Sequence, residues 1–246
     1  MTSCTRGPLV ADLHMHSTCS DGCLTPEELC EHVVRAGFLR CIALTDHDTL
    51  AGAQRVCADG ADLLGGIEVV PGVEISTQHD GRDVHMLGYF VDFASAGLVQ
   101  MFEESRSMRE ARACAIADNL ASDGYDVSGQ DMRSSGKTVN RTLLARMLVE
   151  RSYASDIDDA FARLIGRGCR YYVENIPLDA IEAVHLIREA GGYPFVAHPA
   201  LYHVVDLVPV FKREGMAGLE AYHTLQSPRE SEMLVTLACD EGLGVS

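Results

Sequence analysis

Short apolar segments that alternate with helical ones constrain the fold of this chain more than any other feature. Four apolar segments of strand length occupy residues 9–13, 41–44, 69–73 and 84–87. Between the first two, Thr25 is a helix N-cap, Glu28 completes a capping box, and Gly37 follows the last turn. Because parallel strands need a crossover helix between them, this alternation predicts an α/β fold with a parallel sheet.

The alternation stops in the middle of the chain and resumes later. From about residue 97, the strands give way to helical segments at 99–120, 140–151 and 156–165. Strand segments then return at 195–197 and 218–221, and helices at 179–190, 205–214 and 227–242. We therefore expect a barrel in two parts, residues 1–96 and 174–246, with a mainly helical insertion, residues 97–173, between them.

The composition is typical of a globular protein of 246 residues, with 47% apolar and 23% charged residues. The apolar runs are far shorter than the roughly 20 residues needed to span a bilayer, and residues 1–8 contain no apolar stretch of signal-peptide length. These features predict a cytoplasmic protein without a membrane partner. The nine cysteines are odd in number and irregularly spaced, so we expect reduced thiols.

A formal net charge of −16 limits the possible partners. Such a field repels long polyanions, so duplex DNA or RNA is not an expected partner. A small phosphorylated substrate is not excluded in this way, because bound divalent cations reverse the local sign of the field. No feature of the sequence indicates an oligomeric state.

Residue types that bind metals occur where the apolar segments end. His14, His47, Glu74 and His198 each lie at or directly after an expected strand end. In a parallel barrel the carboxyl ends of the strands meet on one face. These four side chains are therefore expected to converge, although they are far apart in the sequence.

The segment after the first strand offers further candidates. His16 is two positions after His14, which places both imidazoles on one side of an extended segment. Asp21 follows on a turn, where an aspartate before glycine is also an ordinary turn residue. Cys19 and Cys23 are weaker candidates, because no second cysteine pair with zinc-site spacing accompanies them.

Two carboxylates and a lone histidine complete the set. Asp46 and Asp48 flank His47 directly after an apolar strand, and a cation is the simplest way to offset such crowded charge. His85 lies within an apolar segment and, taken alone, would be an ordinary core or surface histidine. Its placement among the other candidates favours a ligand.

Together these residues resemble the PHP (polymerase and histidinol phosphatase) family. Seven ordered motifs carry the resemblance: Asp12-Leu13-His14-Met15-His16-Ser17, Ser20-Asp21-Gly22, Leu44-Thr45-Asp46-His47-Asp48, Pro71-Gly72-Val73-Glu74-Ile75-Ser76, His85-Met86-Leu87-Gly88-Tyr89, Ala197-His198-Pro199 and Gly218-Leu219-Glu220-Ala221-Tyr222-His223. They span nearly the whole chain. The resemblance implies a distorted (β/α)7 barrel, similar to a TIM barrel, that holds a trinuclear site, with Mn, Fe, Zn or Mg as the usual occupants. For this chain we expect two to three divalent ions.

The resemblance also implies a role for each candidate. The ligand sets are His14, His16 and Glu74 for a first ion, Glu74, His85 and His198 for a second, and Asp21 and His47 for a third. Glu74 would bridge two ions, which suits two-metal chemistry. Glu74, His198 and Asp46 are the expected catalytic residues, with Asp46 and Asp48 as partners of ligating histidines.

The insertion resembles that of the nucleotide-directed branch of the family. Asn140-Arg141-Thr142-Leu143-Leu144-Ala145 matches an arginine-containing motif there, so Arg141 is expected to hold a phosphate by its planar guanidinium. Arg109 and Arg112 are weaker substrate-binding candidates on a polar helix. His223 is a further candidate at a strand end.

The leading hypothesis is hydrolysis of a phosphate ester of a small nucleotide, of the AMP or 3′,5′-bisphosphonucleotide class, by a metal-bound hydroxide. A 5′-3′ exoribonuclease acting on short RNA and a histidinol-phosphate phosphatase are alternatives with the same site. A hydrolase of C–N bonds is less favoured, because the metal-bridging lysine expected of one has no clear candidate beyond Lys137 and Lys212. A non-catalytic metal-binding remnant is the remaining alternative.

A final expectation concerns the last residues. Proteins of the PHP family continue past the last helix into Gly-Ser-Asp-x-His, whose Asp and His complete the metal shells, and this chain ends at Ser246 where that motif would begin. The last strand is therefore expected to be truncated. In this form the chain is expected to hold fewer than three ions, and the second ion is expected to bind best.

Overall fold

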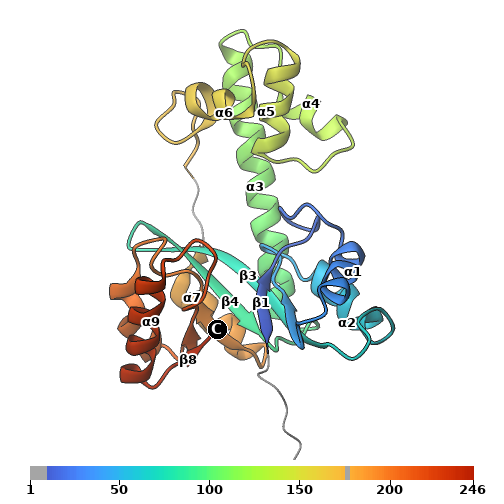
Figure 1. Cartoon of the computed structure of the whole chain (residues 1–246). Helices are drawn as coiled ribbons and strands as arrows, with labels where there is room; N and C mark the ends of the chain where they lie inside the picture. Colours follow the sequence, from blue (N-terminus) through green and yellow to red (C-terminus); the bar gives the residue numbers. More distant parts are fainter. Residues whose placement is uncertain (1–9, 175–177) are drawn as a thin grey trace, which may run out of the picture. The chain divides into compact units, whose positions relative to one another are not determined.

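A curled sheet organises the computed structural model, which describes residues 10–174 and 178–246 (Figure 1). Its strands are β1 (Ala11–Met15), β2 (Cys41–Leu44), β3 (Glu68–His79), β4 (Arg82–Tyr89), β5 (Leu178–Asp179), β6 (Tyr193–Val196), β7 (Gly218–Leu219) and β8 (Gly244–Val245). They pair in the order β1-β2-β3-β4-β6-β7-β8, and β5 pairs with β3. The expected α/β fold similar to a TIM barrel is confirmed. Residues 1–8, on which the expectation about export rests, lie outside the described residues.

The helices that accompany this sheet begin and end largely where the sequence predicts. They are α1 (Pro26–Ala36), α2 (Ala51–Leu63), α7 (Ala180–Glu189), α8 (Val208–Arg213), which a short 3₁₀ turn (Val205–Leu207) precedes, and α9 (Pro228–Glu241). Thr25 and Glu28 form the expected capping box of α1, and Gly37 adopts the left-handed conformation at its end. Ser227 and Glu230 cap α9 in the same way.

One part of the sheet differs from the parallel arrangement that the sequence predicts. β4 pairs antiparallel with both β3 and β6, so β3 and β4 form a hairpin. The cause is the two-residue turn Asp80-Gly81, in which both residues have positive φ, 49° and 73°. Asp-Gly is the preferred pair for such a turn, because its twist matches that of the flanking strands. Glu74 and His85 therefore lie inside paired strands, and His85 does not end a parallel strand.

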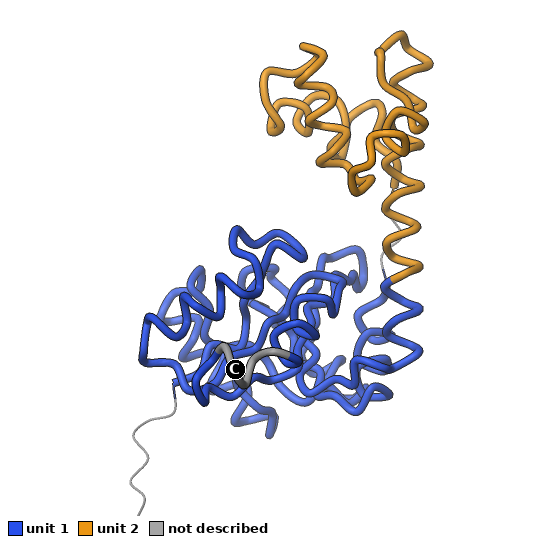
Figure 2. Tube along the Cα trace, turned by 90° about the vertical axis from the view of Figure 1, so that its right-hand side faces the viewer, with its two compact units in different colours: residues 1–102, 177–246 blue, residues 103–176 orange. Residues whose placement is uncertain are grey.

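The chain divides into two units, each with its own core (Figure 2). The first, residues 1–102 and 177–246, contains the sheet, and its core includes the buried side chains Val73, Met86 and Phe211. The second, residues 103–176, is helical, and its core includes Ile116, Leu144 and Ile165. We name them the barrel unit and the helical unit.

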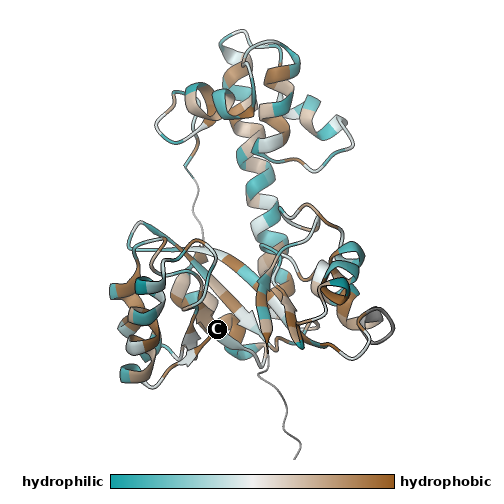
Figure 3. Ribbon diagram, viewed as in Figure 1, coloured by the Kyte–Doolittle hydropathy of each residue, from teal (hydrophilic) through white to brown (hydrophobic). Residues whose placement is uncertain are grey.

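The helical unit is built from capped helices. It contains most of α3 (Ala96–Ser122), α4 (Gly129–Ser134), α5 (Arg141–Glu150) and α6 (Ile157–Ala160), which continues as a π-helical turn (Phe161–Ile165). Side chains of Ser128, Asn140 and Asp156 cap the last three helices at their N-termini. Hydrophilic residues dominate the middle of α3 (Figure 3), whereas its last turns pack into the core of the unit.

Among the described helices, none combines the length and the apolar character that crossing a membrane requires.

Candidate metal centre

Five imidazoles surround the carboxylate of Glu74, which is almost completely buried in the barrel unit. Oε2 of Glu74 lies 2.9 Å from Nε2 of His14, 3.2 Å from Nε2 of His16 and 3.3 Å from Nε2 of His47. Oε1 lies 2.8 Å from Nδ1 of His85 and 3.1 Å from Nε2 of His198. We refer to Glu74 and these five residues as the histidine cluster.

Several strands deliver the histidine cluster to one place. His14 lies on β1, Glu74 on β3 and His85 on β4, whereas His47 follows β2 and His198 follows β6. The backbone of His47 pairs with that of Glu74 in an isolated parallel bridge, which extends the β2–β3 pairing past the end of β2. His198 has a positive φ of 30°, an uncommon conformation for a residue with a side chain. The predicted convergence of His14, His47, Glu74 and His198 is therefore observed.

The pKa values of Glu74, His14 and His47 are all shifted by burial and by their neighbours in and beside the cluster. Burial by itself would raise the pKa of Glu74, but hydrogen bonds from His14, His16, His198 and His85 hold it well below its usual range. Burial likewise acts to lower the pKa of His14, yet hydrogen bonds to Glu220 and Glu74 raise it to about 10. For His47 burial dominates and lowers the pKa, against the attraction of Glu74.

The donor set fits divalent cations. A carboxylate offers about four lone-pair positions, so Glu74 is surrounded by more imidazoles than it can pair with well. The buried Nδ1 atoms of His16 and His198 have no hydrogen-bond partner among the described residues. Imidazole nitrogen and carboxylate oxygen are common ligands of Zn, Mn and Fe. Ions among these side chains would give the unpaired nitrogens a partner and would share the charge of Glu74.

Four groups of three side chains bring their ligand atoms within 4.8 Å of one another: His14, His16 and Glu74; His16, Asp21 and His47; His47, Glu74 and His85; and His14, His198 and Glu220. The first group coincides with the set expected for the first ion. The second contains the pair expected for the third ion, with His16 added. His85 and His198, expected to share an ion, fall into different groups. The assignment of ligands to individual ions stays a prediction.

Asp21 lies at the exposed edge of the cluster, whereas Asp48 contacts the strand that carries Glu74. Asp21 is exposed, with Oδ1 3.6 Å from Nδ1 of His16 and Oδ2 4.0 Å from Nε2 of His47. Asp48 accepts a hydrogen bond from the backbone N–H of Ser76 at 2.9 Å. Asp21 is therefore close enough to His16 and His47 to share an ion with them, and the roles of Asp21 and Asp48 stay predictions.

Asp46 contacts the loop after β1. It is 1% exposed and accepts hydrogen bonds from the Ser17 backbone N–H at 2.7 Å, the Ser17 hydroxyl at 2.8 Å and the Ser20 hydroxyl at 2.7 Å. These partners belong to the loop that carries Asp21. The contacts favour a positioning role, and the catalytic assignment of Asp46 stays a prediction.

Two residues near the cluster were not singled out from the sequence. Glu220, directly after β7, is 2% exposed and contacts both His14 and His198. It belongs to the motif Gly218-Leu219-Glu220, so its position after a strand was an available signal. The ring of Tyr202 lies 4.9 Å from that of His85 and 4.9 Å from that of His198, measured between ring centres. Tyr202 lies in a turn, and no strand-end pattern marks it.

His223, expected on the substrate side, lies beside the cluster. Its ring centre is 5.4 Å from that of His198 and 5.9 Å from that of His14. Burial lowers its pKa, and the neighbouring His198 and His14 act in the same direction against the attraction of Glu220. A neutral, partly exposed imidazole in this position is able to accept or donate a hydrogen bond to a bound molecule.

The arginines expected to bind substrate all lie in the helical unit. The guanidinium of Arg112 is 5.0 Å from the ring centre of Tyr172, and that of Arg141 is 5.4 Å from the ring centre of Phe161. Burial and the neighbouring Arg112 lower the pKa of Arg141. Within the described ranges, neither Arg112 nor Arg141 forms an ion pair with a carboxylate. Arg109 is exposed on α3.

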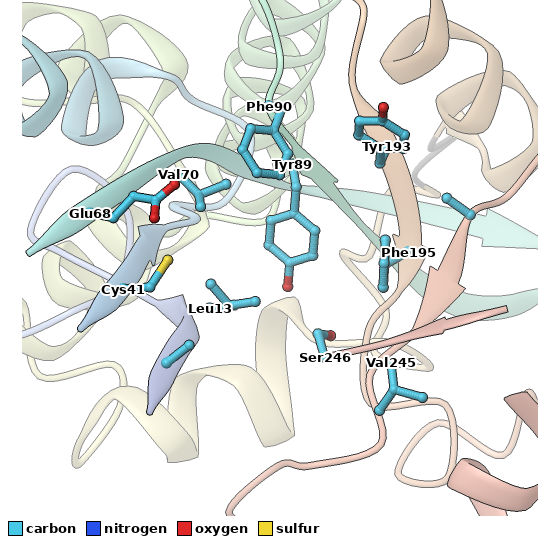
Figure 4. A pocket seen from close by; sticks show the side chains of 12 residues that line it. Leu13, Cys41, Glu68, Val70, Tyr89, Phe90, Tyr193, Phe195, Val245 and Ser246 are labelled. Atoms are coloured by element: carbon cyan, nitrogen blue, oxygen red, sulfur yellow. The ribbon is translucent and has the colours of Figure 1, made fainter. Parts of the chain in front are cut away.

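A cavity of about 840 Å³ lies around the first residues of β1, β2, β3 and β6. These strand ends are opposite to the ends after which His47 and His198 lie. Its lining is mainly apolar, and the Tyr89 ring extends into it with the hydroxyl directed toward Ser246 (Figure 4). None of the residues that line it belongs to the histidine cluster. The cluster, whose side chains have the chemistry and spacing of metal ligands, is therefore the candidate site rather than this cavity.

Comparison of the sequence with known proteins identifies a family and several relatives. The family model described as PHP domain matches residues 12–196. A Haemophilus influenzae protein named 5′-3′ exoribonuclease is 35% identical, over 92% of this chain and 84% of its own length. The 5′-3′ exoribonuclease Rnm of Escherichia coli is 32% identical, over 98% and 85% respectively. A 3′,5′-nucleoside bisphosphate phosphatase of Chromobacterium violaceum is 32% identical, over 85% and 75%.

The solved structures include a similar protein from Bifidobacterium adolescentis, described as a candidate metal-dependent phosphoesterase. Its TM-score is 0.77 at 27% sequence identity, and the match covers 96% of this chain and 85% of that one. The matched region therefore includes residues of both the barrel unit and the helical unit.

Proposed function

The chain belongs to the PHP family, and on this premise we propose that it hydrolyses a phosphate ester of a small nucleotide, of the AMP or 3′,5′-bisphosphonucleotide class. The observation that carries the proposal is the position of Glu74, a single buried carboxylate among five imidazoles. A hydrolase of phosphoric esters uses such a donor set to hold the cations that offset phosphate charge.

The proposed cofactors are two to three divalent ions, with Mn²⁺, Fe²⁺, Zn²⁺ or Mg²⁺ as candidates. When bound, they supply charge that stabilises the phosphoryl oxygens and lowers the pKa of coordinated water. His14, His16, His47, His85 and His198 would bind them, with Asp21 at the exposed edge. Glu74 would share its two oxygens between ions, since His14 meets one oxygen and His85 the other.

Residues outside the cluster support the substrate class. Arg141 and Arg112 form a like-charged pair in the helical unit, and aromatic rings rather than carboxylates lie beside them. Guanidinium groups without an acidic partner are suited to a phosphate, which they bind through parallel N–H groups. We assign them, with Arg109 and His223, to substrate binding. The formal charge of −16 favours a small substrate over a long polyanion.

A second candidate is a 5′-3′ exoribonuclease that acts on short RNA. The names of the Haemophilus influenzae and Escherichia coli relatives favour it. The two reactions share the metal-binding side chains and differ in the size of the leaving group that the site admits. Substrate preference therefore separates them.

The test is phosphate or nucleotide release by the Mn²⁺-loaded protein from four substrates: AMP, 3′,5′-bisphosphoadenosine, histidinol phosphate and a 5′-phosphorylated oligoribonucleotide. We expect phosphate release to be fastest from one of the first two. The control is the Glu74→Gln protein, purified in parallel, which reports contaminating phosphatases. Release of mononucleotides from the oligoribonucleotide at a higher rate would favour the second candidate, and turnover of histidinol phosphate alone would overturn the nucleotide class.

A further inference from the structure

The carboxylate of Glu220 joins two members of the histidine cluster. Its Oε1 lies 2.9 Å from Nδ1 of His14, and its Oε2 accepts the backbone N–H of His198 at 2.7 Å. The Glu220 side chain is 3% exposed, so water does not replace either contact. A buried carboxylate of this kind is expensive unless it is fully paired, and here each oxygen has a donor.

The two contacts have different consequences. The backbone N–H of His198 is always a donor, so Oε2 is committed to it, and the contact holds a residue whose φ is 30°. Nδ1 of His14 is a donor only when it carries a proton. By accepting from it, Oε1 keeps the proton on Nδ1 and leaves the lone pair of the neutral ring on Nε2. That nitrogen lies 2.9 Å from Glu74, on the side of the ring that faces the cluster.

We propose that Glu220 is a positioning residue that fixes the orientation of His14 and keeps a proton on its Nδ1, so that Nε2 is the nitrogen left for an ion once the ring has lost its other proton. Histidine ligands commonly have such a partner on their other nitrogen, where it fixes the ring and raises its basicity. Although Glu220 belongs to a group with metal-ligand spacing, both of its oxygens are occupied by donors of the protein. The inference deepens the proposed function, because it concerns the metal site on which that function depends.

Replacement of Glu220 by Gln tests the proposal, because an amide has one accepting and one donating end. The accepting oxygen must face the N–H of His198, so the NH₂ group faces Nδ1 of His14. The imidazole is then stabilised with its proton on Nε2, where an ion should bind. The side chain keeps its size, so packing is preserved, and circular dichroism and denaturant unfolding of the metal-free proteins check that the fold is intact.

The matched control is Glu214→Gln. Glu214 is also paired with a histidine, since its Oε2 lies 3.2 Å from Nε2 of His185, but this pair is exposed and lies outside the cluster. The full chain is titrated with Zn²⁺ in competition with a chromophoric chelator. We expect Glu220→Gln to weaken the affinity for the ion held by His14 by about 10- to 100-fold, whereas Glu214→Gln leaves it unchanged.

A double-mutant cycle separates action through His14 from a general structural effect. If Glu220 acts through His14, the Gln substitution has little further effect on zinc affinity in a His14→Ala background. Long-range ¹H–¹⁵N NMR of the Zn²⁺-loaded wild type is expected to show His14 protonated at Nδ1. A Glu220→Gln protein with zinc affinity within twofold of wild type, or an equal loss in both backgrounds, overturns the proposal. Because these are binding measurements, a wild type that binds zinc but hydrolyses no nucleotide would refute only the proposed function.

Discussion

Asp46 holds Ser17 at two points: Oδ1 accepts its backbone N–H at 2.7 Å, and Oδ2 accepts its hydroxyl at 2.8 Å. The same carboxylate also accepts the Ser20 hydroxyl, so it organises the loop that presents Asp21 beside His16. The position of the exposed carboxylate of Asp21 therefore depends on hydrogen bonds to the buried carboxylate of Asp46. This relationship leads to the first prediction.

Asp46→Asn is expected to loosen this loop and weaken metal binding at its edge. The amide end cannot accept from the N–H and O–H groups around it, and loss of a hydrogen bond to a charged group costs about 1.5–3 kcal/mol. Urea unfolding should show a loss of that order, and the metal content after dialysis should fall. Asp92→Asn is the control, because Asp92 accepts the backbone N–H of Ala94 at an exposed site. Equal metal content and stability in wild type and Asp46→Asn would contradict the prediction.

Glu74→Gln is expected to lower turnover more than any change at the surface. The substitution removes the negative charge that balances the imidazoles and any ions between them. Loss of a partner of a metal ligand typically costs about 10–100-fold in metal affinity or activity. Glu74 is itself an expected ligand, so we expect a loss of roughly 10²-fold or more, measured as kcat at saturating Mn²⁺. Glu28→Gln, in the exposed capping box of α1, should retain wild-type activity. Near wild-type turnover of Glu74→Gln would show that Glu74 does not bridge ions.

Arg141→Ala is expected to raise KM for nucleotides, with a smaller effect on p-nitrophenyl phosphate. A lost charge-assisted contact to a phosphate away from the reacting ester weakens binding of the larger substrate by about tenfold or more. Arg146→Ala is the control, because Arg146 is exposed on the same helix. Equal changes of kcat/KM for both substrates would remove Arg141 from substrate binding.

Metal binding is expected to release protons, and affinity is expected to rise with pH. His14 has a pKa of about 10 in the metal-free protein because Glu220 and Glu74 accept from it, so it is protonated at neutral pH. An ion can bind Nε2 only after that proton leaves, and this requirement weakens affinity as pH falls below the pKa of His14. Calorimetric titration with Zn²⁺ in two buffers of different ionisation enthalpy measures the number of protons released. Buffer-independent heats would refute the prediction.

The local signals in the sequence predicted the local structure well. Thr25 and Glu28 specify a capping box through neighbouring residues alone, and the structure contains it. The end of β2 could be located because its apolar run stops at Thr45. β3, by contrast, continues to His79, past Glu74, where a strand end was expected. The antiparallel direction of β4 was missed, although Asp80-Gly81 is a hairpin signal that can be read from two residues.

Contacts between distant strands could not be predicted in the same way. The position of Glu220 after a strand can be read from the sequence, but its role depends on Nδ1 of His14, which another strand supplies. The proximity of Arg112 and Arg141 depends similarly on how α3 and α5 pack, because the two residues come from different helices. A pattern in one segment contains no information on which donor a second segment brings to it.

The β3–β4 hairpin has a consequence for the order in which the metal site assembles. Glu74 and His85 are 11 residues apart, whereas His14 and Glu220 are 206 residues apart. Loop-closure entropy makes the distant contact roughly 2 to 3 kcal/mol more costly to form in a flexible chain. The turn at Asp80-Gly81 lets Glu74 and His85 meet as soon as the two strands pair, before the ends of the chain are in place. Of the two contacts, the one between Glu74 and His85 therefore costs less chain entropy to form, because one hairpin supplies both side chains.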